Sequence, residues 1–327
     1  MGKERGKCGR ENMIKREAAS STSLRGQRNG KGKDRAESGG AGPAAGRGRR
    51  RGAAAAGPEM AAERQREPGR GAGACPGVAA CPAAGGCRSS APPAPGQALV
   101  EQARRRLRQF DVGARFSRLP LPRAAVLLPL LVRRGRLHLL LTVRSMQLRR
   151  SPGEVCFPGG KREATDKDDI DTALREAKEE VGLQPEKVEV ICRLIPGIDK
   201  MNNLVTPVVG FIDDTFQVTP NTDEVSGVFV VPLEYFVKPL HYKAFSYETS
   251  SGYLTRIHCF TYHDQEHKKS FKIWGLTAHF AVFLALVIFG ERPTFEVDYD
   301  LDNLMSSSEN YFSNLYASIY ERKKSNL

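Results

Sequence analysis

The first 95 residues contain no phenylalanine, tyrosine or tryptophan, although the 327-residue chain has 25 aromatic residues. Large aliphatic residues are also scarce there, whereas Gly, Ala, Pro and Arg form runs such as residues 39–52. A segment of this composition cannot bury enough apolar surface to offset the conformational entropy that it loses on ordering. We therefore expect residues 1–95 to form a disordered, basic, low-complexity tail ahead of one folded domain.

Positive charge is concentrated in the same segment. Residues 1–95 hold 19 of the 50 Lys and Arg residues but 8 of the 37 Asp and Glu residues, and so most of the net charge of +13. A basic arm can hold nucleic acid loosely, but without aromatic side chains it offers no surface for base stacking. We expect no specific nucleic-acid partner. An extended start site in a GC-rich transcript would give the same composition, so the presence of residues 1–95 in the mature protein stays open.

Paired cysteine motifs and membrane-length apolar runs are missing as well. The seven cysteines form no CxxC pair, which predicts neither a disulfide framework nor a zinc site and indicates a reducing compartment. The apolar run at 273–289 is shorter than the roughly 20 residues that cross a bilayer, and it contains His279. We therefore predict a buried helix there and no transmembrane segment. No apolar run near residue 1 suggests a secretory signal.

The last residues resemble a known cellular address. The chain ends in Ser325-Asn326-Leu327 after two lysines. A terminal Ser-Lys-Leu is read by the peroxisomal import receptor, and this terminus differs from it in the middle residue. We predict a targeting tail over 323–327, an import receptor as partner and a peroxisomal location. If the terminus is an ordinary frayed end that the receptor does not read, the protein is expected in the cytoplasm.

Residues 96–322 have the composition of a folded domain with many strands and few helices. Apolar spacing predicts an amphipathic helix over 96–110, and apolar runs at 124–132 and 137–144 around an Arg-Gly turn predict a β-hairpin. A short helix is expected over 232–236. Further strands are expected over 154–157, 188–194, 204–212 and 228–231, and a second hairpin from 253–257 and 260–262. This mixture predicts layers of α and β structure packed on one another.

One stretch, residues 157–183, joins a glycine pair to an acidic helix. Gly159 and Gly160 allow positive φ and a close approach of the main chain to a phosphate or a metal ion. After them, Arg175-Glu176-Ala177-Lys178-Glu179-Glu180 places three carboxylates at spacings i, i+3 and i+4. Side chains at these spacings share one helical face.

Three like charges on one helical face repel one another unless something compensates them. A hard divalent cation would do so, because such ions take oxygen ligands from carboxylates, water and phosphates. The alternative interpretation is a solvated acidic face with Arg175 and Lys178 as ion-pair partners. The carboxylate spacing by itself leaves both interpretations open.

The glycine loop and the helix together resemble the box of the Nudix hydrolases, a glycine and an acid followed by REUxEExGU, with U aliphatic. Asp166 stands where the general box has Glu, Ala177 takes an aliphatic position, and the spacing from glycine to Arg175 is one residue longer. These departures resemble the coenzyme A diphosphatase subgroup. The motif positions are Gly160, Lys161, Asp166, Arg175, Glu176, Glu179, Glu180, Gly182 and Leu183.

A second motif just upstream resembles the same subgroup, in which it has the form LLTxRSxxxRxxxGxxxFPGG. Residues 140–145 read LLTVRS, and Arg149, Gly153 and the run 157–160 match the other specified positions. The resemblance covers the domain and leaves out the tail. It implies an α+β Nudix fold, an α/β/α sandwich around a mixed curved sheet.

The resemblance also implies a reaction. Such an enzyme hydrolyses the diphosphate bond of coenzyme A and acyl-CoAs to 3′,5′-ADP and (acyl-)4′-phosphopantetheine. Glu176 and Glu180, with Glu179, would hold Mg²⁺ or Mn²⁺, while Arg175 would pair with a box carboxylate and fix the loop. The general base stays open between a glutamate of the box and one outside it.

The upstream motif also contains the residues that we expect to bind the substrate. Arg144 and Arg149 precede the glycine loop, and guanidinium groups suit phosphates, so we expect them to bind substrate together with the loop glycines. They could instead be surface residues that stabilise the loop.

Two other functions compete with this one. The first is hydrolysis of other nucleoside diphosphate derivatives, such as ADP-ribose, nucleotide sugars or capped RNA, and the second is non-catalytic sensing of coenzyme A. A monomer is the simplest expectation, although the sequence does not fix the oligomeric state.

Overall fold

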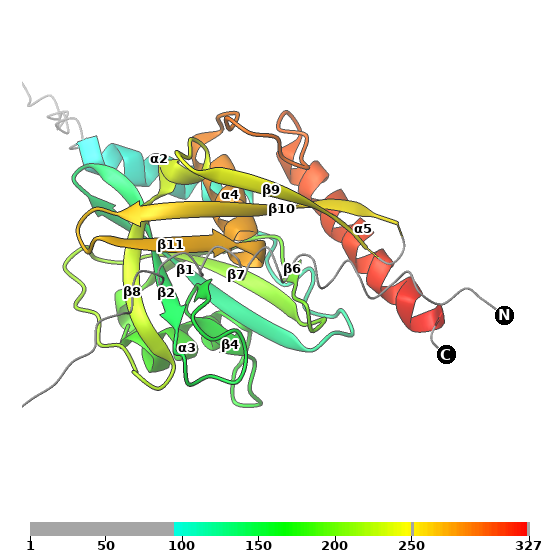
Figure 1. Ribbon diagram of the computed structural model, residues 1–327, viewed down its shortest axis with the longest axis horizontal. Coiled ribbons are helices and arrows are strands. Elements are labelled where there is room, and N and C mark those ends of the chain that lie inside the picture. Colours follow the sequence, from blue (N-terminus) through cyan, green and yellow to red (C-terminus); the bar gives the residue numbers. More distant parts are fainter. Residues whose placement is uncertain (1–94, 250–251, 326–327) are drawn as a thin grey trace, which may run out of the picture. The chain divides into compact units, whose positions relative to one another are not determined.

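A computed structural model describes residues 95–249 and 252–325. The chain divides into one unit over Met1–Ala83, which lies outside the described residues, and a second over Ala84–Leu327. All labelled elements in Figure 1 belong to the second unit. The disorder expected for residues 1–95 therefore stays a prediction, and Asn326 and Leu327 of the targeting motif also lie outside the described residues.

Helix α2 (Pro95–Gln109) and the hairpin of β1 (Arg123–Arg133) and β2 (Arg136–Arg144) open the domain. Both were predicted from the sequence, and the structure confirms them. In the hairpin, the register pairs Leu130 with Leu139, and Arg134 and Gly135 make the turn with positive φ. A two-residue turn with two positive φ angles matches the right-handed twist of the flanking strands.

The central strand of the main sheet is β1. It pairs in parallel with β7 (Leu204–Phe211) and antiparallel with β2 and β4 (Gly159–Lys161). The path through this eight-stranded sheet is β3-β2-β1-β7-β5, with β4, β6 and β8 attached to β1, β7 and β2. The remaining strands are β3 (Val155–Cys156), β5 (Glu189–Arg193), β6 (Gly197–Ile198) and β8 (Val225–Pro232).

Helices cover both faces of this sheet. Successive side chains of a strand point to opposite faces, and in β1 Leu128 and Leu130 belong to the core under α2 and α4 (Gly275–Phe289). Ala125 and Leu127 belong to the core under α3 (Asp169–Val181). The α/β/α layering expected from the sequence is therefore confirmed.

A second, three-stranded sheet packs on α4 (Figure 1). It consists of β9 (Tyr242–Glu248), β10 (Leu254–Asp264) and β11 (Lys269–Trp274) in the order β11-β10-β9. The hairpin predicted from 253–257 and 260–262 is wrong, because nearly all of both segments lies within β10. The residues between them, His258 and Cys259, continue the strand, since they pair with β9 and β11 and are not turn formers.

The buried helix predicted for 273–289 is confirmed as α4, although Ile273 and Trp274 end β11 instead. The short helix expected at 232–236 is the 3-10 helix η2 (Leu233–Phe236), and a second 3-10 helix, η1, covers Pro185–Lys187.

Helix α5 (Leu304–Ser325) was not predicted. Its Phe312 packs in a separate apolar cluster with Val112 and Leu121. Within the described residues, no helix combines the length and the apolar character needed to cross a membrane.

Candidate active site

Helix α3 carries the acidic face, and its ends are set by local sequence. Asp168 caps the first turn by accepting hydrogen bonds from the amides of Ile170 and Asp171. Gly182 ends the helix in a left-handed conformation, and its amide donates to Ala177 and Lys178 carbonyls. The buried face of α3 includes apolar residues that hold it on the sheet: Ala173, Ala177 and Val181.

The sequence analysis placed the glycine pair in a loop after the strand expected at 154–157. In the structure the pair instead begins a short strand. Gly159 and Gly160 open β4, which pairs with Ala125 and Val126 at the start of β1. A Cβ on Gly159 would lie 2.4 Å from the Ala125 carbonyl oxygen, and a Cβ on Gly160 would lie 2.3 Å from a Glu176 carboxylate oxygen. The two glycines are therefore required for β4 to lie between β1 and the carboxylates of α3.

Glu180 is the most deeply buried carboxylate of the acidic face, with 5% of its surface exposed. One of its oxygens accepts a hydrogen bond of 3.2 Å from the Gly159 amide. Burial raises the pKa of Glu180 to about 8; the neighbouring Glu176 raises it further, while the Gly159 amide and Arg144 oppose the shift. The ionised form of Glu180 thus lacks a fully compensating positive charge.

The other two glutamates contact Arg175. Its Nη2 lies 3.2 Å from Glu176 Oε1 and its Nη1 lies 2.9 Å from Glu179 Oε2. Burial raises the pKa of Glu176 even though Arg175 acts to lower it. The Glu179 side chain is 51% exposed. The three glutamates therefore differ in environment, with Glu180 inside, Glu176 at the glycine loop and Glu179 toward solvent.

Arg175 also ties the loop to the helix. Its Nε donates to Asp166 Oδ1 at 3.0 Å, and its Nη2 donates to the Lys161 carbonyl at 3.0 Å. Hydrogen bonding to Arg175 lowers the pKa of Asp166 to about 2. The buried Asp166 accepts two further bonds, from the Thr172 hydroxyl and the Glu163 amide. In this network Lys161 contributes its backbone carbonyl.

The two arginines predicted to bind substrate lie in different surroundings. Arg144 ends β2, its Nε donates to the Arg150 carbonyl at 3.3 Å, and its charge lowers the pKa of Glu180. Arg144 is therefore part of the electrostatic environment of the carboxylates. Arg149 is exposed and makes no hydrogen bond or ion pair with any other residue that the structure describes.

A further carboxylate, Glu224, comes from outside the sequence motifs. Its charge raises the pKa of both Glu176 and Glu180. The loop that carries it is held at the end of α3, where the Asn221 amide donates to the Glu180 carbonyl at 2.9 Å. The Glu224 carbonyl in turn accepts from the Ser145 amide at 2.7 Å. No sequence signal pointed to Glu224, because it is separated from the box by three strands.

The donor set suits a hard divalent cation. Carboxylate oxygens are the ligands that Mg²⁺ and Mn²⁺ prefer, and the buried, incompletely compensated Glu180 would gain stability from a nearby cation. Among the described residues, no three His, Cys, Asp or Glu side chains already converge on one point. We attribute this to Arg175, which engages Glu176 and Glu179.

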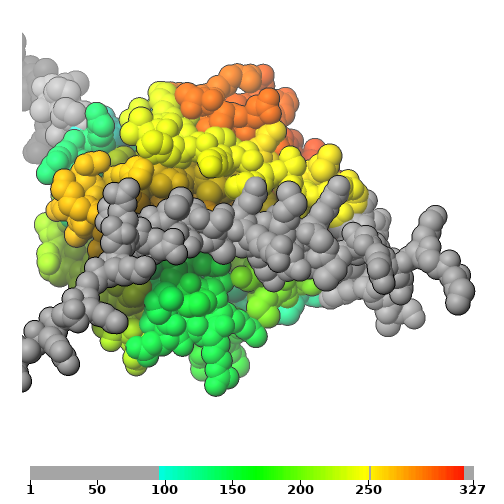
Figure 2. Space-filling model, viewed as in Figure 1, coloured from blue at the N-terminus to red at the C-terminus, as the bar shows by residue number. Residues whose placement is uncertain are grey.

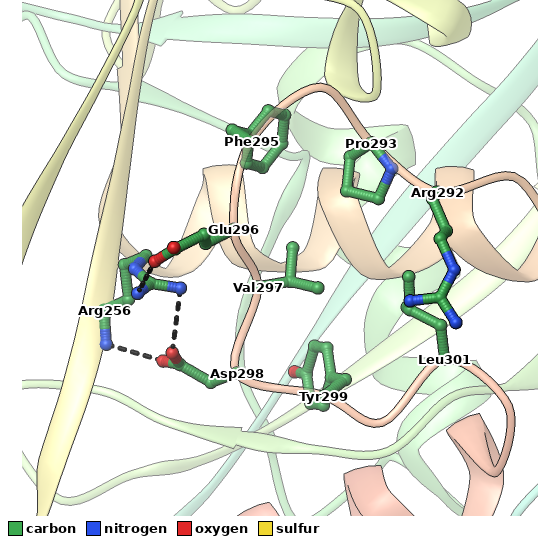
Figure 3. A pocket seen from close by; sticks show the side chains of 9 residues that line it. All are labelled: Arg256, Arg292, Pro293, Phe295, Glu296, Val297, Asp298, Tyr299 and Leu301. Atoms are coloured by element: carbon green, nitrogen blue, oxygen red, sulfur yellow. Dashed lines mark hydrogen bonds and ion pairs between the residues drawn. The ribbon is translucent and has the colours of Figure 1, made fainter.

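A separate hollow lies between β10 and the segment 292–301 (Figure 3). Its volume is about 360 Å³, and none of its lining residues belongs to the carboxylate site. Arg256 at its edge is paired with Glu296 and Asp298. In Figure 2 the yellow residues of the second sheet and the green residues around position 150 lie on different parts of the visible surface. The hollow is therefore distinct from the carboxylate site.

Comparison with known proteins agrees with this fold. The NUDIX domain profile matches residues 121–250. The chain is 50% identical over 214 residues to the mouse (Mus musculus) peroxisomal coenzyme A diphosphatase NUDT7, covering 65% of this chain and 90% of that protein. It is 42% identical over 172 residues to the uncharacterized Nudix hydrolase NudL of Citrobacter koseri, covering 52% of this chain and 84% of that protein.

A plant relative is matched over a smaller share of its length. The mitochondrial Nudix hydrolase 15 of Arabidopsis thaliana is 42% identical over 164 residues, which are 49% of this chain and 56% of that protein. The fold and the carboxylate site define a hydrolase of phosphoanhydride bonds, and Nudix hydrolases generally require divalent metal ions. The chain belongs to the Nudix hydrolase family.

Proposed function

We propose that the protein hydrolyses the diphosphate bond of coenzyme A and of acyl-CoAs, releasing 3′,5′-ADP and 4′-phosphopantetheine or its acyl form. The observation that carries the proposal is the hydrogen bond from the Gly159 amide to Glu180. It joins the last residues of the upstream motif to the acidic helix. The 50% identity to a coenzyme A diphosphatase over 90% of that relative supports the same substrate.

Metal binding and loop positioning fall to different residues of the site. Glu176 and Glu180, with Glu179, would hold Mg²⁺ or Mn²⁺, and such an ion neutralises the diphosphate and lowers the pKa of the attacking water. Arg175 holds the loop through Asp166 and the Lys161 carbonyl, which keeps the glycines of β4 against α3. The absence of side chains at 159 and 160 lets β4 lie against β1 and the Glu176 carboxylate.

The proton of the attacking water requires a base. Glu224 is a carboxylate that acts electrostatically on Glu176 and Glu180 while standing outside α3. We assign it as a candidate for this role, next to the glutamates of the box. Arg144 would bind a phosphate of the substrate, and Arg149, which is exposed and unpaired within the described residues, is free to bind another.

Product analysis tests the reaction. Purified protein is incubated with coenzyme A and MgCl₂, and the products are separated by chromatography and identified by mass. We expect 3′,5′-ADP and 4′-phosphopantetheine in equal amounts. Faster turnover of ADP-ribose, a nucleotide sugar or capped RNA would contradict the substrate assignment, and binding of coenzyme A without turnover would indicate a sensor.

The proposed location is the peroxisome, where the reaction would regulate the level of coenzyme A. Support comes from the Ser-Asn-Leu terminus and from the peroxisomal relative. Ser325 is the last residue of α5, while Asn326 and Leu327 lie outside the described residues. Deleting these last three residues should move a fluorescent fusion from peroxisomes to the cytoplasm, and unchanged peroxisomal fluorescence would contradict this role.

A further inference from the structure

Two exposed methionines stand on loops close to the carboxylate site. Met146 is 72% exposed and belongs to the loop 145–153, which we call the arginine loop. Met201 is 45% exposed and belongs to the loop 199–203, which we call the Asp199 loop. Single exposed apolar side chains are common on protein surfaces, but these two stand on loops that contact each other next to Arg144.

Direct contacts join these loops to each other and to the site. Arg150 Nη1 lies 3.2 Å from the Met201 sulfur, and the Lys200 ammonium donates to the Ser151 hydroxyl at 2.9 Å. The Arg150 carbonyl also accepts from Arg144, and the Ser145 amide at the start of the arginine loop donates to the Glu224 carbonyl at 2.7 Å. The two loops therefore form one rim that begins at the proposed diphosphate site.

The Asp199 loop is held in a fixed conformation. The Asp199 carboxylate accepts hydrogen bonds from the Met201 amide at 2.8 Å, the Asn203 amide at 2.8 Å and the Asn203 side chain at 2.7 Å. A binding surface that is already ordered loses less entropy when a ligand arrives. Met201 is therefore presented to solvent by a preorganised loop.

Apolar surface continues beside this loop. Gly197, two residues before it, leaves room for Leu276 of α4, since a Cβ there would lie 2.4 Å from the Leu276 Cδ1 atom. The Thr277 hydroxyl donates to the Val155 carbonyl at 3.1 Å. These contacts place the first turn of α4 between β3 and β6, and Leu276 is half-buried there. The rim thus leads from charged groups toward apolar ones.

The chemistry of the rim matches one part of the proposed substrate. The phosphates of an acyl-CoA suit Arg144 and the metal-binding glutamates, whereas its alkyl chain needs an apolar and adaptable surface. Methionine provides this, because its thioether is polarizable and its side chain flexible. Resting on the proposed function, we propose that Met146 and Met201 bind the acyl chain of acyl-CoA substrates and favour longer chains.

Steady-state kinetics over a chain-length series tests this proposal. Full-length wild type and the Met146→Gln, Met201→Gln and double variants are compared on coenzyme A and on its acetyl, octanoyl and lauroyl thioesters. The double variant should lower kcat/KM for the two long thioesters by about fifteenfold through KM, the effect of exposing roughly two methylene groups. Values for coenzyme A and acetyl-CoA should not change.

Two variants serve as controls. Leu254→Gln replaces a 65% exposed apolar residue of β10, away from both loops, and should leave all four values unchanged. Met201→Leu keeps the apolar surface and should keep the preference for long chains. Circular dichroism melting shows that each variant is folded.

The outcomes separate this proposal from the proposed function. A double variant that matches Leu254→Gln on every substrate overturns the acyl-binding role. An equal loss for coenzyme A and lauroyl-CoA also overturns it, because the methionines would then act on the common part of the substrate. A wild-type protein that cleaves none of the four substrates overturns the proposed function, and the acyl-binding role with it.

Discussion

At the scale of single residues, burial of the Glu180 carboxylate lowers the stability of the fold, although the proposed reaction needs this group. Its burial raises its pKa to about 8 because the charged form is poorly solvated. A carboxylate whose folded pKa lies above its unfolded value stabilises the fold at low pH. That stability is lost as the pH rises from about 4.5 to about 8. Without a cation, the folded protein therefore keeps Glu180 largely protonated at neutral pH, whereas the unfolded chain is ionised there, and this difference costs stability.

Replacing Glu180 by Gln should stabilise the metal-free protein and abolish hydrolysis. The amide has the same shape and no charge, and its oxygen can still accept the Gly159 amide hydrogen bond. In EDTA, Tm of the variant should exceed that of wild type by a margin that grows with pH up to about 8. Turnover should fall about a hundredfold or more, because a metal ligand is lost.

Adding MgCl₂ is the control for that comparison. The ion should raise Tm of wild type by binding the folded state, and it should raise Tm of Glu180→Gln much less. A variant that melts below wild type at pH 8 in EDTA would contradict the assignment of Glu180 as a destabilising buried charge.

The Gly160→Ala variant tests the close approach of β4 to α3. The new Cβ would lie 2.3 Å from a Glu176 carboxylate oxygen, so the Glu176 side chain must move. Because this is the end of a flexible side chain, we expect a stability loss below about 1 kcal/mol. Activity should nevertheless fall at least about tenfold. The matched control is Gly227→Ala in β8, where the new Cβ would lie 3.6 Å from the nearest atom, on Val143. Equal activity of the two variants would refute the role of the contact between Gly160 and Glu176.

Secondary structure elements were predictable from sequence where their signals were local. The acidic spacing over 175–180 marks α3, and an Arg-Gly turn between two apolar runs marks the β1–β2 hairpin. Helix α5 was missed because its sequence is rich in Ser and Asn, which are weak helix formers. It is stabilised instead by a tertiary contact of Phe312 that no local pattern reveals.

The same distinction applies to the site. The glycines and glutamates of residues 157–183 form a continuous pattern, and the structure brings Gly160 and Glu176 into contact. Glu224 joins them only because strands of the folded sheet return its loop to the end of α3. Sequence alone also could not show that Arg144 bonds to the Arg150 carbonyl while Arg149 is exposed to solvent.

Phe312 should contribute much of the free energy that holds α5 against the rest of the domain. It is 3% exposed and packs with Leu121 and Leu204, among others. Phe312→Ala should lower the free energy of unfolding by about 3 to 5 kcal/mol, as expected for loss of a buried Phe side chain. Urea denaturation measures the effect, and Ser313→Ala, at an exposed position of α5, is the control. A loss below about 1 kcal/mol would show that α5 is held by other contacts.

At the scale of the whole molecule, one buried histidine links stability to pH. His258 is 3% exposed, and its Nδ1 lies 2.9 Å from the Tyr242 hydroxyl. Burial lowers its pKa to about 4, with a further contribution from Arg256. The unfolded chain binds the proton near pH 6.5. The stability due to the neutral imidazole is thus complete above 6.5 and is lost as pH falls toward 4.

We therefore expect His258 to lower Tm as the pH falls from 7 to 5, an effect opposite to that of Glu180, and the slope of Tm against pH should be smaller in His258→Gln than in wild type. The slope is compared because the substitution can also change Tm uniformly. His267→Gln, at an exposed position of the β10–β11 turn, should leave the slope close to that of wild type. Equal slopes for wild type and His258→Gln would show that other groups cause the acid sensitivity.

The parallel pairing of β1 with β7 determines when the active site can assemble. The register joins Arg123 to Leu204, and the glycine loop and the whole of α3 lie in the chain between these partners. Contacts between residues so far apart in sequence slow folding. A ribosome adding about 5 to 20 residues per second leaves β1 without β7 for several seconds. During that interval β1 lacks the strand that covers this edge, so the glycine loop and α3 reach their final positions only after residues 204–211 have been synthesised.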